Sequence, residues 1–226
     1  MKNCYILLSL VLSVIFTSCS PKITRSMQYP KMYEEKPVSI VIMPPINQTH
    51  FVEAKEYFYT TLYVPLCEKG YYVFSPYLTM EMFQNESAYD SELFIEKDIS
   101  IFHKVLGADA AMFTKIKSWK RNNLLGQLTV GVEYILRSTH TGETLYQREG
   151  IVTVDLSTSS DDNTALGALV DMVSTFVATA STDKVLAGRA CTAYVLSDMP
   201  DGKYSPSYGK DGTLPAGEPV FSATVK

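Results

Sequence analysis

The chain has 226 residues, a formal net charge of −4 and 46% hydrophobic residues, a composition typical of a globular protein with one sizeable domain or two small ones. No concentrated basic cluster occurs, so we expect no nucleic-acid partner.

The N-terminus carries the pattern of a lipoprotein signal peptide. Lys2 supplies a basic start, residues 5–16 form an apolar run, and small residues precede Cys19. The run is shorter than the roughly 20 residues that a membrane-spanning helix needs. We predict that residues 1–18 are removed and that Cys19 becomes a lipidated N-terminus carrying acyl chains such as palmitate. Ser20 follows in place of Asp, so the sorting rule of Gram-negative lipoproteins predicts the outer membrane, at its periplasmic face.

Three segments are expected after the signal peptide. Residues 19–37 contain several prolines and charges with little periodicity, which predicts a flexible tether. Residues 38–199 are expected to form a single folded domain. Residues 200–226, rich in Gly, Pro, Ser and Tyr, predict an irregular C-terminal tail that wraps the domain or docks on a partner.

The first half of the domain alternates strands and helices. An apolar run at 38–43, ended by two prolines, predicts a buried strand, and aromatic residues at 71–74 predict a second. Helical periodicity lies between them at 54–66 and after them at 78–83 and 95–106. Strand, helix, strand and helix joined by short connections predict parallel pairing.

The second half changes to the pattern of antiparallel strands. Apolar and polar residues alternate at 110–119, 127–138 and 144–155, with hairpin turns between them. A long helix is expected at 166–177 and a last one near 189–196. The predicted fold class is α/β: a mixed sheet with a parallel N-terminal half and antiparallel C-terminal strands, with helices packed on the sheet.

Two cysteines remain after Cys4 is removed and Cys19 is lipidated. In an oxidising envelope Cys67 and Cys191 could form a disulfide. Both lie in apolar stretches, so two free thiols are the alternative.

Neither an enzyme nor a metal site is predicted. The three histidines, His50, His103 and His140, have no His or Cys partner at ligand spacing. We interpret His103 as a partly buried structural histidine and Asp109 as a turn residue that caps backbone amides. No nucleophile elbow, zinc-protease helix or phosphate-binding loop occurs in the sequence. We expect no catalysis, no cofactor and no metal.

The chain has 15 tyrosines, and some of them stand where a partner could bind. Tyrosine combines an apolar ring with a polar tip and is enriched at protein interfaces. We take Tyr71, Tyr72, Tyr204 and Tyr208 as candidate partner-binding residues. The alternative is that these rings only line the edge of the core.

Four short motifs follow one another along the chain: IMPPIN at 42–47, PLCEKGYYVFSP at 65–76, LGADA at 106–110 and YSPSYGKD at 204–211. Together they resemble a family of bacterial lipoproteins with a domain of unknown function (number seven-nine-nine). The first and third motifs, with Thr-Gly-Glu at 141–143, are also distantly similar to curli-secretion-channel lipoproteins and to the N-terminal domain of the Tol-system periplasmic protein.

The resemblance implies an α/β domain on the outer membrane, no catalytic residues, and a protein partner similar to a curli-secretion-channel lipoprotein. Self-association into a homo-oligomer also stays open. We predict a non-enzymatic accessory lipoprotein of an envelope transport or secretion assembly, which binds its partner through the sheet edge or the tail. The alternatives are a periplasmic small-molecule or glycan-binding module with a pocket beside Tyr71 and Tyr72, and an activator of a cell-wall enzyme.

Overall fold

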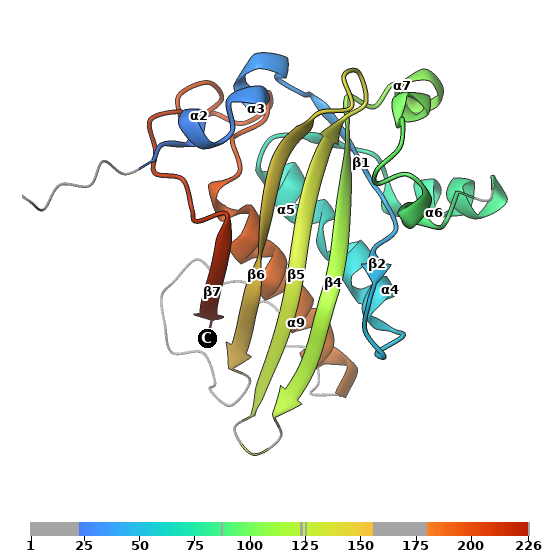
Figure 1. Cartoon of the computed structure of the whole chain (residues 1–226), viewed down its shortest axis with the longest axis vertical. Helices are drawn as coiled ribbons and strands as arrows, with labels where there is room; N and C mark the ends of the chain where they lie inside the picture. The colour runs from blue at the N-terminus through green and yellow to red at the C-terminus, as the bar shows by residue number, and fades with distance from the viewer. Residues whose placement is uncertain (1–22, 87, 123, 125, 156–179, 226) are drawn as a thin grey trace, which may run out of the picture.

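One mixed sheet runs through the computed structural model, which describes residues 23–86, 88–122, 124, 126–155 and 180–225 (Figure 1). The strands lie in the order β3-β1-β4-β5-β6-β7, and β2 pairs with β4. Their bounds are β1 (Ser39–Ile42), β2 (Ile46–Asn47), β3 (Tyr72–Val73), β4 (Ala110–Asn122), β5 (Gln127–Ser138), β6 (Thr144–Asp155) and β7 (Val220–Val225).

The pairing of the two halves agrees with the sequence pattern. β1 is parallel to both β3 and β4, as expected for strands joined through helices. β4, β5 and β6 form an antiparallel meander. The predicted α/β fold with a mixed sheet is therefore confirmed.

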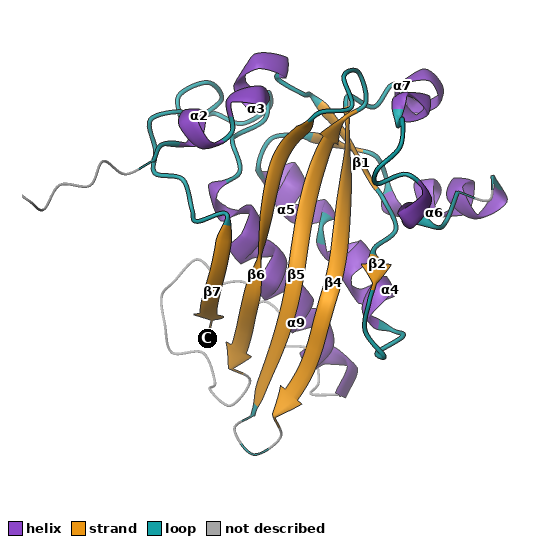
Figure 2. Cartoon of the chain, in the orientation of Figure 1, coloured by secondary structure: helices purple, strands orange, loops and turns teal. Residues whose placement is uncertain are grey.

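Helices pack on both faces of the sheet (Figure 2). They are α2 (Arg25–Gln28), α3 (Pro30–Glu35), α4 (Ala54–Thr61), α5 (Tyr63–Glu68), α6 (Pro76–Asn85), α7 (Ser100–Leu106) and α9 (Ala180–Val195), with short 3-10 turns η2 (Ser91–Leu93) and η3 (Leu196–Asp198). The helix expected at 166–177 lies outside the described residues. Among the described helices, none combines the length and apolar character needed to cross a bilayer.

Two apolar clusters hold these layers together. On one face, inward residues of β5 such as Val132 and Tyr134 pack against Phe58 of α4 and Cys191 of α9. On the other face, among the residues that the structure describes, a smaller cluster lies over β1 and the neighbouring parts of β4 and β5 and contains Phe83 of α6 and Phe102 of α7, among others. Burying each such side chain contributes about 1.5–3 kcal/mol to folding.

The helix expected at 54–66 is two helices, α4 and α5, with a break at Leu62. Pro65 explains the break. It has no N–H to donate to the carbonyl of Thr61, so it fits only in the first turn of a new helix.

Residues 23–37 are not the flexible tether that the sequence suggested. They form α2 and α3, and Tyr29 and Met32 are buried in the main core. The start of the segment pairs with the tail: the Arg25 amide donates to Leu214 O at 2.9 Å, and the Ala216 amide donates to Ile23 O at 2.9 Å. Helices of four and six residues are too short to produce a periodic sequence pattern.

The tail is likewise more regular than expected, because it ends in β7, which is parallel to β6. Gly150 in β6 allows this pairing. A Cβ at that position would lie 2.3 Å from Phe221 O and 2.6 Å from the Phe221 ring, so only glycine lets β7 approach. The expected irregular structure is limited to the residues between η3 and β7.

Candidate partner-binding surface

The motif at 65–76 and the motif at 204–211 lie against each other. The Gly202 amide donates to Lys69 O at 2.7 Å, and the Tyr204 amide donates to Gly70 O at 2.9 Å. Gly70 has φ +85°, and a Cβ there would lie 2.3 Å from Ser205 N. Glycine is therefore required at this position by both conformation and space, and it brings the tail tyrosines next to β3.

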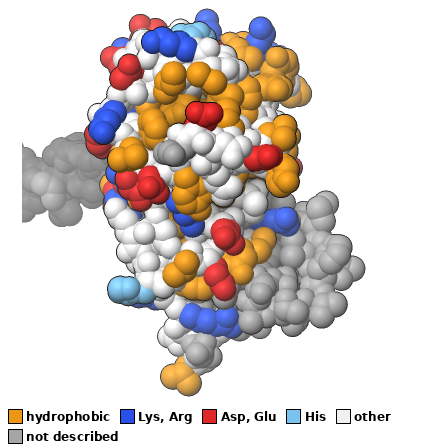
Figure 3. All heavy atoms as spheres, turned by 90° about the vertical axis from the view of Figure 1, so that its right-hand side faces the viewer, with side chains coloured by type: hydrophobic (Ala, Val, Ile, Leu, Met, Phe, Trp, Pro, Cys, Tyr) orange, Lys and Arg blue, Asp and Glu red, His pale blue; other side chains and the backbone are white. Residues whose placement is uncertain are grey.

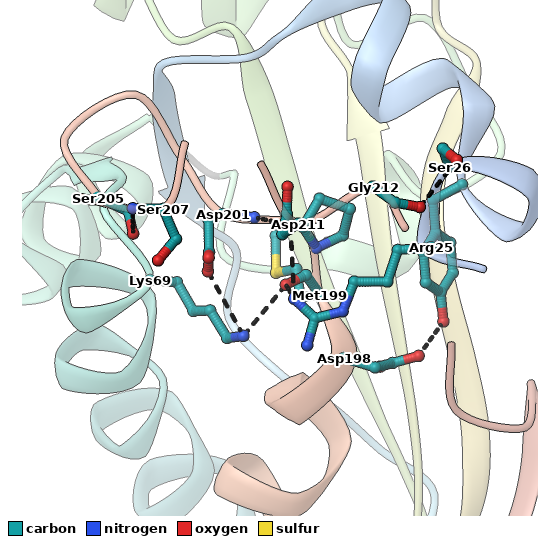
Figure 4. A network of polar contacts seen from close by, with 12 residues as sticks. Arg25, Ser26, Lys69, Asp198, Met199, Asp201, Ser205, Ser207, Asp211 and Gly212 are labelled. Atoms are coloured by element: carbon teal, nitrogen blue, oxygen red, sulfur yellow. Dashed lines mark hydrogen bonds and ion pairs between the residues drawn. The ribbon is translucent and has the colours of Figure 1, made fainter. Parts of the chain in front are cut away.

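A network of polar contacts holds the first part of the tail, residues 199–212, against the rest of the domain (Figure 4). Lys69 Nζ donates to Met199 O at 3.1 Å and lies 3.7 Å from Asp201 Oδ1. The buried Asp211 accepts from Arg25 Nη1 at 3.4 Å and from the Asp201 amide at 2.8 Å. The network joins α2, α5 and the tail, so this part of the surface has a rigid frame.

Asp198 is the centre of a second, more deeply buried network. It accepts from Arg148 Nη1 at 3.0 Å, from the hydroxyls of Tyr29 at 2.7 Å and Tyr146 at 3.0 Å, and from the Gly217 amide at 2.7 Å. Burial, and then the charge of Asp198, raise the pKa of both tyrosines above the ordinary value. The phenols therefore stay neutral and act as donors.

The four tyrosines predicted to bind a partner separate into one buried and three accessible side chains. Tyr71 is only 4% exposed, and its hydroxyl donates to Pro200 O at 2.7 Å, so it is a structural residue and the prediction of a contact role is wrong for it. Tyr72, Tyr204 and Tyr208 are 54%, 66% and 38% exposed.

Tyr63 of α5 joins this group and was missed by the sequence analysis. It is exposed, and its helix packs beside β3, the strand that carries Tyr72. The Tyr72 ring packs edge-on against Phe74, with centroids 5.2 Å apart. We call Tyr63, Tyr72, Tyr204 and Tyr208 the tyrosine surface.

More exposed apolar side chains follow on the elements after β3. Figure 3 shows the α6 and α7 side of the molecule, where hydrophobic side chains gather in the upper half. Exposed examples are Tyr77 and Leu78 of α6 and Ile101 and Val105 of α7. Exposed apolar side chains that gather on one face are typical of a protein contact.

The hollow beside Tyr71 is small. It has a volume of about 90 Å³ and is lined by Met32, Tyr33, Tyr71, Pro200 and Tyr208, among others. Ligand pockets usually have about 300–1,000 Å³. This hollow gives no support to a glycan or metabolite pocket at Tyr71 and Tyr72.

Cys67 and Cys191 are both free. Cys67 is exposed on α5, whereas Cys191 is buried in the core on α9, where burial raises the pKa of its thiol. The structure therefore has the unpaired alternative and not the disulfide.

The histidines are arranged in a way that the sequence did not indicate. His50 is exposed and apart, but His103, Asp109 and His140 come together, with potential ligand atoms all within 4.8 Å of one another. Asp109 also caps β1, because Oδ2 accepts from the amides of Val38 at 2.9 Å and Ser39 at 3.0 Å, which confirms its predicted capping role. The available signal was topological: the start of β4 and the turn between antiparallel β5 and β6 lie at the same end of the sheet.

Comparison with known proteins gives a consistent set of relatives. A family model described as "Putative lipoprotein GNA1162-like" matches residues 27–203. A protein of Neisseria meningitidis serogroup B, described as a putative lipoprotein, is 24% identical over 193 residues, covering 84% of this chain and 89% of that protein.

Solved structures of lipoproteins and other proteins are also similar, among them the following two. The crystal structure of lipoprotein GNA1162 from Neisseria meningitidis has 21% identity and a TM-score of 0.48, covering 62% of this chain and 96% of that one. A PelC dodecamer from Paraburkholderia phytofirmans has 12% identity and a TM-score of 0.43, covering 80% of this chain and 94% of that one.

Proposed function

Because the chain belongs to the GNA1162-like lipoprotein family, we propose that it is a lipid-anchored envelope protein that binds a protein partner and catalyses no reaction. The anchor is Cys19 and the membrane is the outer membrane, at its periplasmic face. The partner belongs to a transport or secretion assembly, and the sequence resemblance favours a lipoprotein similar to the curli secretion channel.

The anchor is tested by labelling cells of the native host with an alkyne analogue of palmitate and separating their membranes. The full chain should carry the label and sediment with the outer membrane, because two or three acyl chains anchor a protein stably and one does not. Cys19→Ala should carry no label and should no longer sediment with the outer membrane. Cys67→Ala is the matched control, since Cys67 is an exposed thiol on the folded body and should be dispensable.

Label that persists in Cys19→Ala, or a wild-type chain found in the soluble fraction, would contradict the anchor.

The tyrosine surface is the observation that supports partner binding. Its rings are exposed, while the backbone beneath them is held by Gly70, Lys69 and Asp211. A ring on a fixed backbone loses little conformational entropy when a partner covers it, and Tyr is among the residues that carry most of the energy at interfaces.

Partner binding is tested by affinity purification of the tagged full chain from detergent-solubilised native membranes. A double variant, Tyr72→Glu with Tyr204→Glu, should reduce the co-purified partner by at least about tenfold, since charge is placed in a desolvated contact. Leu124→Glu is the matched control: Leu124 is 97% exposed, at the connection between β4 and β5.

Wild type that purifies alone, or a double variant that retains the partner at the wild-type level while folded by circular dichroism, would contradict the proposal. The identity of the retained protein separates a transport assembly from a cell-wall enzyme, which is the partner under the alternative function.

A further inference from the structure

His103, Asp109 and His140 belong to three elements that meet at the upper end of the sheet (Figure 1). His103 lies in the last turn of α7, and Gly107, with φ +70°, ends that helix. Asp109 directly precedes β4, and His140 lies in the turn between β5 and β6. Each side chain therefore projects from a position that the fold defines independently.

The distances suit a shared metal ion. His140 Nε2 and Asp109 Oδ1 are 3.3 Å apart, and the His103 and His140 ring centroids are 4.0 Å apart. Two ligands at about 2.0–2.1 Å from a tetrahedral Zn²⁺ are separated by about 3.3 Å. All three ligand atoms lie within 4.8 Å of one another, so a metal ion would have to draw the more distant pairs together by about 1 Å.

Outer hydrogen bonds orient two of the three ligands. His103 Nδ1 is 3.2 Å from Ala108 O, so a proton on Nδ1 leaves Nε2 as the free ligand atom. Asp109 Oδ2 accepts from the amides of Val38 and Ser39 and from Ser39 Oγ, which leaves Oδ1 facing His140 Nε2. Burial raises the pKa of Asp109, but these bonds outweigh it and hold the pKa below the ordinary value.

From this geometry we propose that His103, Asp109 and His140 bind one divalent transition-metal ion, with Zn²⁺ as the ion that the donor set fits best. Two imidazoles and one carboxylate form a three-ligand set that leaves one coordination position free. The side chain of His140 is 47% exposed, so that position is open to solvent or to a ligand from a partner. The proposal replaces the sequence-based expectation that no metal is bound, and it is independent of the tyrosine surface.

The test is titration of the metal-free full chain, purified in detergent, with Zn²⁺ in a calorimeter. Wild type should bind one equivalent. His103→Gln and His140→Gln should each weaken binding by at least about tenfold, since the loss of an outer partner alone costs 10–100-fold. His50→Gln is the matched control, because His50 is exposed and outside the cluster. His140→Gln carries little risk to folding, because its site is a partly exposed turn.

Two further measurements separate a metal site from a structural hydrogen-bond cluster. Co²⁺ should give visible d–d absorption without thiolate charge-transfer bands, which excludes Cys67 as a ligand. Ser39→Ala removes the hydroxyl that orients Asp109 and should also weaken Zn²⁺ binding. The proposal is overturned by absent saturable binding, by thiolate bands, or by a His50→Gln variant that binds as weakly as His140→Gln.

Discussion

Asp198 is the residue whose loss should cost the most stability. The side chains of Asp198 and Arg148 are 7% and 3% exposed, and two phenols and an amide complete the carboxylate's shell. Asp198→Ala leaves the Arg148 charge buried without its partner, so we expect a loss of about 3–5 kcal/mol in the free energy of unfolding, measured in urea. Glu81→Ala, at an exposed position of α6, should change it by less than about 0.5 kcal/mol. Equal effects of the two changes would refute the role of the network.

Gly70 offers a second comparison, with Gly209 as its control. Both have positive φ, +85° and +71°, so alanine at either position costs about 1–2 kcal/mol in backbone strain. Only Gly70 has a neighbour that a Cβ would strike, at 2.3 Å, while nothing lies within 4 Å at Gly209.

Gly70→Ala should therefore destabilise more than Gly209→Ala and loosen the tail, seen as faster amide exchange at Gly202 and Tyr204. Indistinguishable thermal unfolding of the two variants would show that close packing at Gly70 is unimportant.

β7 should be displaced by a single methyl group added to its neighbour β6. Gly150→Ala places a Cβ against Phe221, so β7 must move away and expose Phe221 and Val225, each worth about 1.5–3 kcal/mol when buried. Gly131→Ala in β5 meets mainly the hydroxyl of Ser118, which can rotate, so we expect a change within about 1 kcal/mol. Hydrogen exchange of β7 amides checks this, and unchanged protection in Gly150→Ala would contradict it.

The long strands could be predicted because each carries its own signal. β4, β5 and β6 have 12 or 13 residues, and alternation over that length is unambiguous. The helix predicted at 95–106 began too early. Ile95 and Ile99 are buried and so fit the apolar periodicity, but α7 begins only at Ser100. Asp98 sets that start by accepting from the Ser100 amide at 2.8 Å.

The candidate sites were less predictable, because burial and proximity depend on the whole fold. Successive side chains of extended backbone face opposite sides, so Tyr71, which directly precedes β3, is buried, whereas Tyr72 in β3 is exposed. Composition could not separate them. Predicting the cluster of His103, Asp109 and His140 requires knowledge of the strand order, and no local sequence pattern contains that information.

The whole molecule should lose stability at alkaline pH. Burial raises the pKa of Tyr59 to about 12 and raises those of Tyr29, Tyr71, Tyr134 and Tyr146 as well. Below pH 10 both folded and unfolded chains hold these protons, so the stability is fully present. Above about pH 10 the unfolded chain loses protons first and is favoured, at a cost of about 2–3 kcal/mol for Tyr59 alone by pH 12.

Urea midpoints between pH 8 and pH 12 should fall above pH 10. The exposed tyrosines ionise near pH 10 in the folded chain, whereas the buried phenols should add their phenolate absorbance only on unfolding. Tyr59→Phe should reduce the slope of the free energy of unfolding against pH above pH 10, by the amount that corresponds to the release of about one proton. A midpoint that is constant up to pH 12 would contradict the burial of these phenols.

The packing of residues 23–28 against the tail limits the distance between the folded domain and Cys19. The carbonyl of Ile23 accepts from the amide of Ala216. Four residues along the chain separate Ile23 from Cys19, so their Cα atoms can be at most about 14 Å apart. With acyl chains on Cys19, the end of the body formed by α2, α3 and the tail must rest close to the lipid headgroups. Under the proposed anchoring through Cys19, a partner that reaches the tyrosines of that end would have to come to the same bilayer.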